Sequence, residues 1–188
     1  MKKQLFAVLY ACVCLSAGAA EYLGFDLGTL TYDNAKKQLQ AANAPFEDTW
    51  GYQGYVQDLP SLKVLGYEKF NKYGNVKEAW LQFSPKKVLY KITVQYNDAG
   101  DTFKLLKDAL DTKYGRATQH GAGFETEYRY RDGKADITLH RNTFGFGNDQ
   151  VTSLIYVWPA LIGEVKQMQA AIEADIKKKN AKKAGADL

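Results

Sequence analysis

The histidines, cysteines and serines of this chain offer few ways to build a catalytic site. There are only two histidines, His120 and His140, and both cysteines lie near the N-terminus. No His-Glu-x-x-His spacing occurs, so the ligands of a zinc centre are lacking. A nucleophilic serine would have to be Ser61, Ser84 or Ser153, and none stands in the Gly-x-Ser-x-Gly context of a nucleophile elbow. We therefore predict no catalytic residue, no metal site and no cofactor.

Two glycine-rich segments and one carboxylate pair are also better explained without a ligand. Segments 121–123 (Gly-Ala-Gly) and 145–147 (Gly-Phe-Gly) lack the lysine and hydroxyl of a phosphate-binding loop, and we interpret both as turns. Glu125 and Glu127 fall on one strand face, where solvation is favoured over acid–base chemistry. His140 is expected to pair with Glu125 or with water.

Aromatic residues give the one positive indication of function. The chain contains 13 tyrosines, nine phenylalanines and three tryptophans. Exposed tyrosines favour protein recognition because they bury a large area at low entropic cost. The alternative is that these rings only cover a sheet. The candidate partner-binding residues lie in a polar, turn-rich region and are Trp50, Tyr52, Tyr55, Tyr67 and Tyr73.

The first 20 residues have the pattern of a signal peptide. Lys2 and Lys3 precede an apolar run at 5–15 and small residues at 16–20. The run is shorter than the roughly 20 apolar residues that a membrane anchor needs. We expect export to the periplasm or the medium, with cleavage near Ala19–Glu21.

Cleavage at that site removes every cysteine. The competing interpretation is a lipoprotein acylated at Cys12, although bulky Tyr10 fits a lipid-attachment box poorly. Loss of Lys2 and Lys3 leaves 23 of the 25 basic residues against 21 acidic ones. A net charge of about +2 does not predict nucleic-acid binding.

A strand followed by a helix is the clearest local signal. Apolar residues alternate over 88–96, which predicts a strand with one packed face and one solvated face. Asp101 or Thr102 is expected to cap the helix that follows, and Gly115 to end it. An earlier helix is predicted to start after Thr31 and to end near Asn43.

The second half of the chain contains a predicted hairpin and a closing helix. Alternation over 124–131 and the dipeptide Asp132-Gly133 predict a two-residue turn that pairs Tyr128 with Ile137, after a polar loop at 116–123. The closing helix has a single apolar stripe and is expected to pack on the sheet up to Ile176. The stripe consists of Leu161, Val165, Met168, Ile172 and Ile176.

These elements predict an α+β fold: an antiparallel sheet of six or seven strands with helices on one face and a helix at the C-terminus. The expected divisions are a signal peptide (1–20), one domain (21–176) and a lysine-rich flexible tail (177–188). The order of elements suggests two tandem units of a helix plus a meander.

Two short motifs carry a family resemblance. They are Phe-Asp-Leu-Gly-Thr at 25–29, before a helix, and the helix from Asp-Thr-Phe at 101–103 to Lys-Tyr-Gly at 113–115, before a hairpin. With the element order, they resemble the small exported proteins of the BamE-like and β-lactamase-inhibitor-protein-like group. The resemblance implies helices on one face of an antiparallel sheet and binding of other envelope proteins.

The expected function is therefore a non-enzymatic protein-binding module: an inhibitor, an adaptor or an envelope-assembly factor. The expected partner is another envelope or secreted protein. Two alternatives stay open: a small envelope hydrolase that needs no metal, and a binder of a small apolar ligand held between sheet and helices.

Overall fold

A computed structural model describes residues 20–52 and 55–186, with the backbone alone at 50–52, 55–58, 148 and 183–186. The chain folds as α+β, as predicted. Its elements in order are β1 (Ala20–Tyr22), β2 (Phe25–Leu27), α1 (Tyr32–Ala41), β3 (Phe46–Tyr52), β4 (Tyr55–Val64), α2 (Glu68–Asn71), β5 (Val76–Phe83), β6 (Leu89–Tyr96), α3 (Asp101–Tyr114), β7 (Thr118–Ala122), β8 (Glu125–Arg131), β9 (Asp136–Asn142), the 3-10 turn η1 (Gly147–Asp149), β10 (Val151–Val157) and α4 (Pro159–Ala186).

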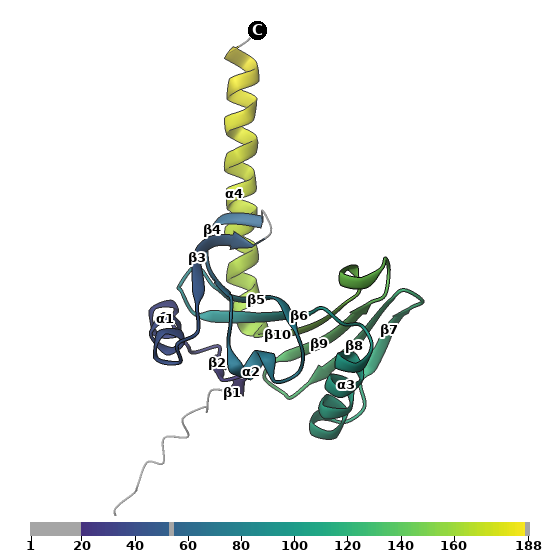
Figure 1. Ribbon diagram of the computed structural model, residues 1–188. Coiled ribbons are helices and arrows are strands. Elements are labelled where there is room, and N and C mark those ends of the chain that lie inside the picture. The colour runs from purple at the N-terminus through teal and green to yellow at the C-terminus, as the bar shows by residue number, and fades with distance from the viewer. Residues whose placement is uncertain (1–19, 53–54, 187–188) are drawn as a thin grey trace, which may run out of the picture.

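Eight of the strands form one antiparallel sheet in the order β3-β4-β5-β6-β10-β9-β8-β7. β6 pairs with β10 at the centre, so each half of the sheet is a four-stranded meander. β1 and β2 form a separate hairpin beside it (Figure 1). The sheet thus has eight strands among the described residues, where the sequence indicated six or seven.

The unexpected strand is β7, which occupies most of the segment predicted to be a polar loop. β7 pairs with β8 from Thr118 opposite Arg129 to Ala122 opposite Glu125. All five of its residues are exposed. It therefore has no alternation of buried and exposed side chains, and that alternation is the signal by which a strand is found in a sequence.

The main core lies between the sheet and helices α1 and α3. Every second residue of the central strands points into it, as the pleat requires. Helix α1 contributes Leu39, and α3 contributes Leu106 and Leu110. The largest fully buried side chains include Tyr96, Phe25, Phe70, Phe83, Leu62, Leu81, Ile92, Ile137 and Leu139.

A bulge in β6 creates a second, smaller core on the opposite face. Gln82 pairs with Lys91 and Phe83 pairs with Leu89, so Tyr90 is left without a partner in β5. Tyr90 then packs with Leu59 and Val165, while Leu89 and Ile92 stay in the main core. Because α4 covers Tyr90 on the face opposite to α1 and α3, the expectation of one solvated face on this strand is wrong, and so is the expectation of helices on one face of the sheet.

Helix α4 packs on the sheet through its first turns only. Val165 is buried, Met168 is half-buried and Ile176 is 51% exposed. The helix runs on to Ala186 and projects from the domain (Figure 1). The predicted packing up to Ile176 is therefore wrong, and the segment predicted to be flexible is helical as far as the structure describes it. No described helix combines the length and the apolar character needed to cross a bilayer.

The hairpin between β8 and β9 has the predicted faces but a different register. Tyr128 lies opposite Leu139, not Ile137, and Arg131 pairs with Asp136. The Asp132 carboxylate accepts hydrogen bonds from the backbone amides of Lys134 and Ala135, both at 2.9 Å. This side-chain turn extends the loop to four residues and moves the register by two, which keeps each side chain on its face.

One of the two predicted helix caps is confirmed. Thr31 accepts a hydrogen bond from the amide of Asn34 at the start of α1. At α3 the N-cap residue is Gly100, not Asp101 or Thr102, and the Asp98 carboxylate two residues earlier accepts from the amides of Gly100 and Thr102, both at 2.6 Å. Gly115 ends α3 with φ of 80°, as predicted.

Candidate functional site

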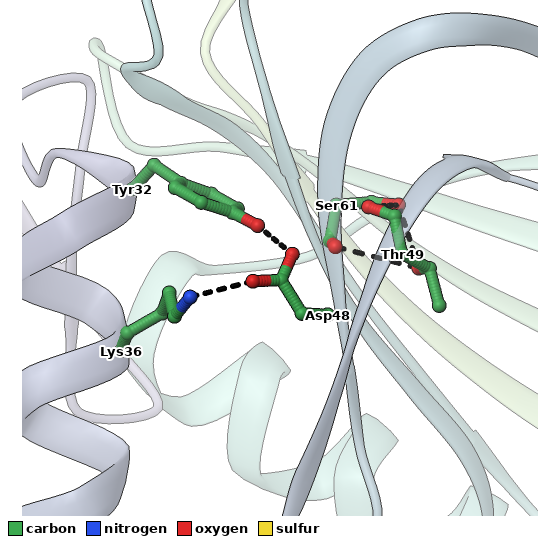
Figure 2. Close-up of polar contacts among 5 residues, drawn as sticks. All are labelled: Tyr32, Lys36, Asp48, Thr49 and Ser61. Carbon is green, nitrogen blue, oxygen red and sulfur yellow. Dashed lines mark hydrogen bonds and ion pairs between the residues drawn. The ribbon is translucent and has the colours of Figure 1, made fainter.

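The described residues contain no group of three or more His, Cys, Asp and Glu side chains placed to hold a metal ion. The cluster of polar side chains that most resembles a catalytic group lies at α1. Figure 2 shows the Tyr32 hydroxyl and the Lys36 ammonium converging on the carboxylate of Asp48, with Lys36 Nζ 2.5 Å from Oδ2. Thr49 and Ser61 form a separate pair, with their hydroxyl oxygens 3.1 Å apart. These contacts join α1 to β3 and β3 to β4.

Ser153 does not form a catalytic triad either. Glu127, His140 and Ser153 lie side by side on β8, β9 and β10 in register. The register thus places His140 beside Glu127 rather than the expected Glu125. Among the described side chains, no hydrogen bond joins these three residues; Glu127 instead pairs with Arg129, and Ser153 is only 4% exposed. A buried serine without a base is not a usable nucleophile.

Of the aromatic residues predicted to bind a partner, Tyr52 and Tyr55 lie opposite each other in the β3–β4 hairpin, whereas Tyr67 and Tyr73 lie elsewhere. Tyr67 is buried, in ring contact with Phe25 and Phe70. Tyr73 is half-buried at the edge of the main core. The side chains of Trp50, Tyr52 and Tyr55 lie outside the described part of the structure.

The backbone separates Tyr55 from Tyr67. Tyr55 begins β4, and Tyr67 follows the far end of the same strand. A strand of that length spans about 30 Å, so these tyrosines do not share one contact surface.

Two connections of the sheet, between β7 and β8 and between β9 and β10, lie at the end of the sheet farthest from α1 (Figure 1), and both carry exposed aromatic residues. Phe124 lies in the turn between β7 and β8, and Phe144 and Phe146 lie in the connection between β9 and β10. Their exposed fractions are 66%, 68% and 90%. The rings of Phe124 and Phe144 meet edge to face with centroids 6.0 Å apart. We call these three residues the phenylalanine corner.

Hydrogen bonds hold the two loops of the phenylalanine corner together. The amide and the hydroxyl of Thr143 both donate to the carbonyl of Phe124, at 2.8 and 3.2 Å. The side-chain amide of Gln150 donates to the backbone carbonyls of Thr143 and Gly145, at 3.3 and 3.2 Å. Gly145 has φ of 88°, and a Cβ there would lie 2.6 Å from Asp149. The loop therefore requires glycine at this position.

The base of the corner is fixed to the loop between β6 and α3. Arg141 donates to the carbonyl of Ala99 at 2.6 Å, and its guanidinium lies 5.3 Å from the ring centre of Phe103. Thr152 donates to the carbonyl of Asp98 at 2.5 Å. The burial of the Asp98 carboxyl would raise its pKa, but the amides of Thr102 and Gly100 outweigh that effect and keep the pKa below its usual value.

Strand β7 extends this surface with unpaired backbone groups. It is the last strand in the described sheet. One of its two edges therefore carries amides and carbonyls that form no hydrogen bonds to another described strand of the sheet. Its sequence, Thr-Gln-His-Gly-Ala, has neither the lysine nor the proline that often protects an edge. An extended peptide could therefore pair with it.

The sequence contains a signal for this site that the interpretation divided: segment 145–147 was assigned to a turn, and Phe124 to the packed face of a strand, although its ring is exposed. Phenylalanine beside glycine in polar segments marks a large apolar side chain where no core strand or helix is expected. The surface combines exposed aromatic area with open backbone groups. Comparison with known proteins finds no matching family model, curated protein or solved structure.

Proposed function

We propose that this chain is a non-enzymatic protein-binding module that docks through the phenylalanine corner. The observation that carries the proposal is the exposure of three phenylalanine rings on loops whose shape is fixed by hydrogen bonds. A soluble domain gains no folding stability from such rings, whereas an interface uses them as its centre. Phe146, which is 90% exposed, is the foremost contact.

The rigidity of the two loops supports this proposal. A flexible loop loses conformational entropy when a partner orders it, and that loss weakens binding. Here Thr143 and Gln150 have already fixed the loop in the free protein. The energy of burying the rings is then available for affinity.

Strand β7 supplies the second part of the proposed interface. A segment of the partner pairs with its open edge, and the phenylalanine rings fill an apolar pocket of the partner beside that segment. Backbone pairing gives affinity without strong sequence selectivity, and the rings give specificity.

The proposed setting is outside the cytoplasm, after removal of a signal peptide near Ala19–Glu21. The argument is the order of charged, apolar and small residues in segment 1–20, which lies outside the described residues except for Ala20. The partner is then another envelope or secreted protein, which this chain inhibits, escorts or helps to assemble.

We also propose that the domain arose by duplication of a helix and four strands. Helix α1 precedes the meander β3 to β6, and α3 precedes the meander β7 to β10, with α2 as an insertion in the first unit. The last strands of the two meanders, β6 and β10, pair with each other. We also propose the resemblance to the BamE-like and β-lactamase-inhibitor-protein-like group, because the order of the elements supports it together with the two short motifs at 25–29 and 101–115.

Site-specific photo-cross-linking tests the docking surface. Replacement of Phe146 by the photoreactive analogue benzoylphenylalanine should link the protein to one defined partner on irradiation of envelope extract. The same analogue at Leu105, which is 52% exposed on α3, is the matched control and should give no such product.

Two results would overturn the proposal. One is identical cross-linked products from positions 146 and 105. The other is a product that contains only a second copy of this chain, with a dimer in sedimentation equilibrium that Phe146→Ser dissociates. In that case the corner is a homodimer contact and not a site for a different protein.

A further inference from the structure

A pocket of about 350 Å³ lies beside α3, where the two halves of the domain meet. We call it the seam pocket. The β1–β2 hairpin, the segment around α2, helix α3 and strand β10 each form one wall. Its lining includes Tyr22, Lys72, Tyr73, Leu110, Lys113 and Tyr156.

The inner part of the seam pocket is apolar and aromatic. Leu110 is 5% exposed and Tyr156 is 5% exposed. The rings of Tyr22 and Tyr156 lie 4.8 Å apart at a tilt of 34°. Such a surface binds a flat or aliphatic body by excluding water from it.

The rim of the pocket is basic. Lys69, Lys72 and Lys113 line it, and Glu21 is the only carboxylate among the described lining residues. Glu21 forms an ion pair with Lys69 at 3.1 Å. The charge of the rim is therefore positive, and Lys72 and Lys113 provide it.

Those two lysines extend over aromatic rings at the mouth. Lys72 Nζ lies 5.8 Å from the ring centre of Tyr73, and Lys113 Nζ lies 5.0 Å from that of Tyr114. These cation–π contacts keep the ammonium groups beside the opening.

The walls exist before any ligand arrives. The side-chain amide of Gln38 donates to the backbone carbonyl of Gly24 at 2.5 Å. This hydrogen bond holds the β1–β2 turn on α1. The Tyr22 hydroxyl donates to Asp132, which connects that hairpin to the second half of the domain. Burial raises the pKa of the Tyr156 hydroxyl, and Tyr114 and Tyr73 raise it further, so this hydroxyl stays protonated as a donor.

We propose that the seam pocket binds a small amphipathic anion: an aromatic or short aliphatic body among the tyrosines, with one carboxylate or phosphate group between Lys72 and Lys113. The volume, about 350 Å³, falls in the range of small-molecule sites. The site is separate from the phenylalanine corner, so it does not depend on the docking function.

Fluorescence titration with two matched dyes tests the charge requirement. Anilinonaphthalene sulfonate has an aromatic body and one anionic group, and N-phenylnaphthylamine has the same rings without the charge. The purified protein should bind the sulfonate at one site, roughly tenfold more tightly than the neutral dye. Equal affinity for the two dyes would contradict the proposal.

Variants then locate the site. Ala109→Phe should fill the pocket and abolish sulfonate binding, because Ala109 lines it from the exposed side of α3, whereas Leu105→Phe on the same helix should leave binding unchanged. The double variant Lys72→Glu, Lys113→Glu should weaken binding of the sulfonate by about tenfold but not that of the neutral dye. Lys104→Glu is the charge control.

Competition identifies the anionic group. Displacement of the sulfonate by decanoate assigns a carboxylic acid, and displacement by decyl phosphate alone assigns a phosphate ester. Equal displacement by decanol would overturn the proposal, as would a binding signal that survives in Ala109→Phe and disappears when Phe124, Phe144 and Phe146 are replaced by serine. In that last case the dye reports the phenylalanine corner.

Discussion

The ring of Phe124 stands edge-on to the ring of Phe144, at an interplanar angle of 83°, although the two residues belong to different connections of the sheet. Neither ring is part of the core, and both are about two-thirds exposed. The carbonyl of Phe124 accepts two hydrogen bonds from Thr143, so backbone contacts rather than ring burial bring the loops together. The pair thus forms an aromatic surface that is exposed to solvent.

The first prediction is that the phenylalanine corner contributes little to folding. Phe146→Ala should change the free energy of unfolding by less than about 0.5 kcal/mol, because the ring is 90% exposed. Phe70→Ala should cost about 3–5 kcal/mol, because Phe70 is fully buried. Urea denaturation of both variants gives the comparison; a loss above about 2 kcal/mol for Phe146→Ala would assign the corner to the core.

The second prediction concerns the two faces of β8. Tyr128→Ala should destabilise the protein by about 2 kcal/mol, since the ring packs 5.6 Å from the ring of Phe103 and is half-buried. Glu127→Ala, on the other face, should stay within about 1 kcal/mol, because its ion pair with Arg129 is exposed to solvent. Equal denaturation midpoints would contradict this assignment of faces.

The third prediction is a pH dependence at the cap of α3. The pKa of Asp98 is lowered in the folded state, so its stabilising effect is present above the unfolded value of 3.8 and is lost as the pH falls through the folded pKa. Asp98→Ala should therefore cost about 1 kcal/mol near neutral pH and much less once the pH has fallen through the folded pKa, below 3.8.

Asp108→Ala, at an exposed position in the middle of α3, is the control for that measurement. It should change stability little at either pH. If Asp98→Ala destabilised the protein equally at both pH values, the ionised carboxylate would not be the source of the stabilisation.

The fourth prediction separates the packed and the projecting parts of α4. A chain that stops after Lys177 should melt within about 2 °C of the full chain, because the residues removed contact no described part of the core. A chain that stops after Pro159 should melt well below it, because Leu59 and Tyr90 lose their contact with Val165. Val165→Ala should reproduce part of that loss, and Ile176→Ala should not.

The sequence predicted the elements whose signals are local. Thr31 begins a helix and Gly115 ends one because capping depends on a few neighbouring residues. The alternation over β8 and β9 assigned each side chain to the correct face. The sequence did not predict β7, because a strand with every residue exposed has no periodic pattern.

Features that depend on distant contacts were missed. The register at Asp132 follows from a side chain that makes the loop longer, and the packing of Tyr90 follows from a bulge. The phenylalanine corner exists only because β7–β8 and β9–β10 meet at one end of the sheet. Its residues belong to separate segments of the sequence, and only the pairing of strands brings those segments together.

The most direct measurement is the affinity of the cross-linked partner, once purified, for the intact protein and for the variant with serine at positions 124, 144 and 146. Isothermal titration calorimetry should show a dissociation constant at least about a hundredfold weaker for the variant, as expected for loss of an aromatic interface centre. Far-ultraviolet circular dichroism and the melting temperature of the variant should match the parent. A dissociation constant within about threefold of the parent's, in a variant that is folded, would contradict docking through the phenylalanine corner.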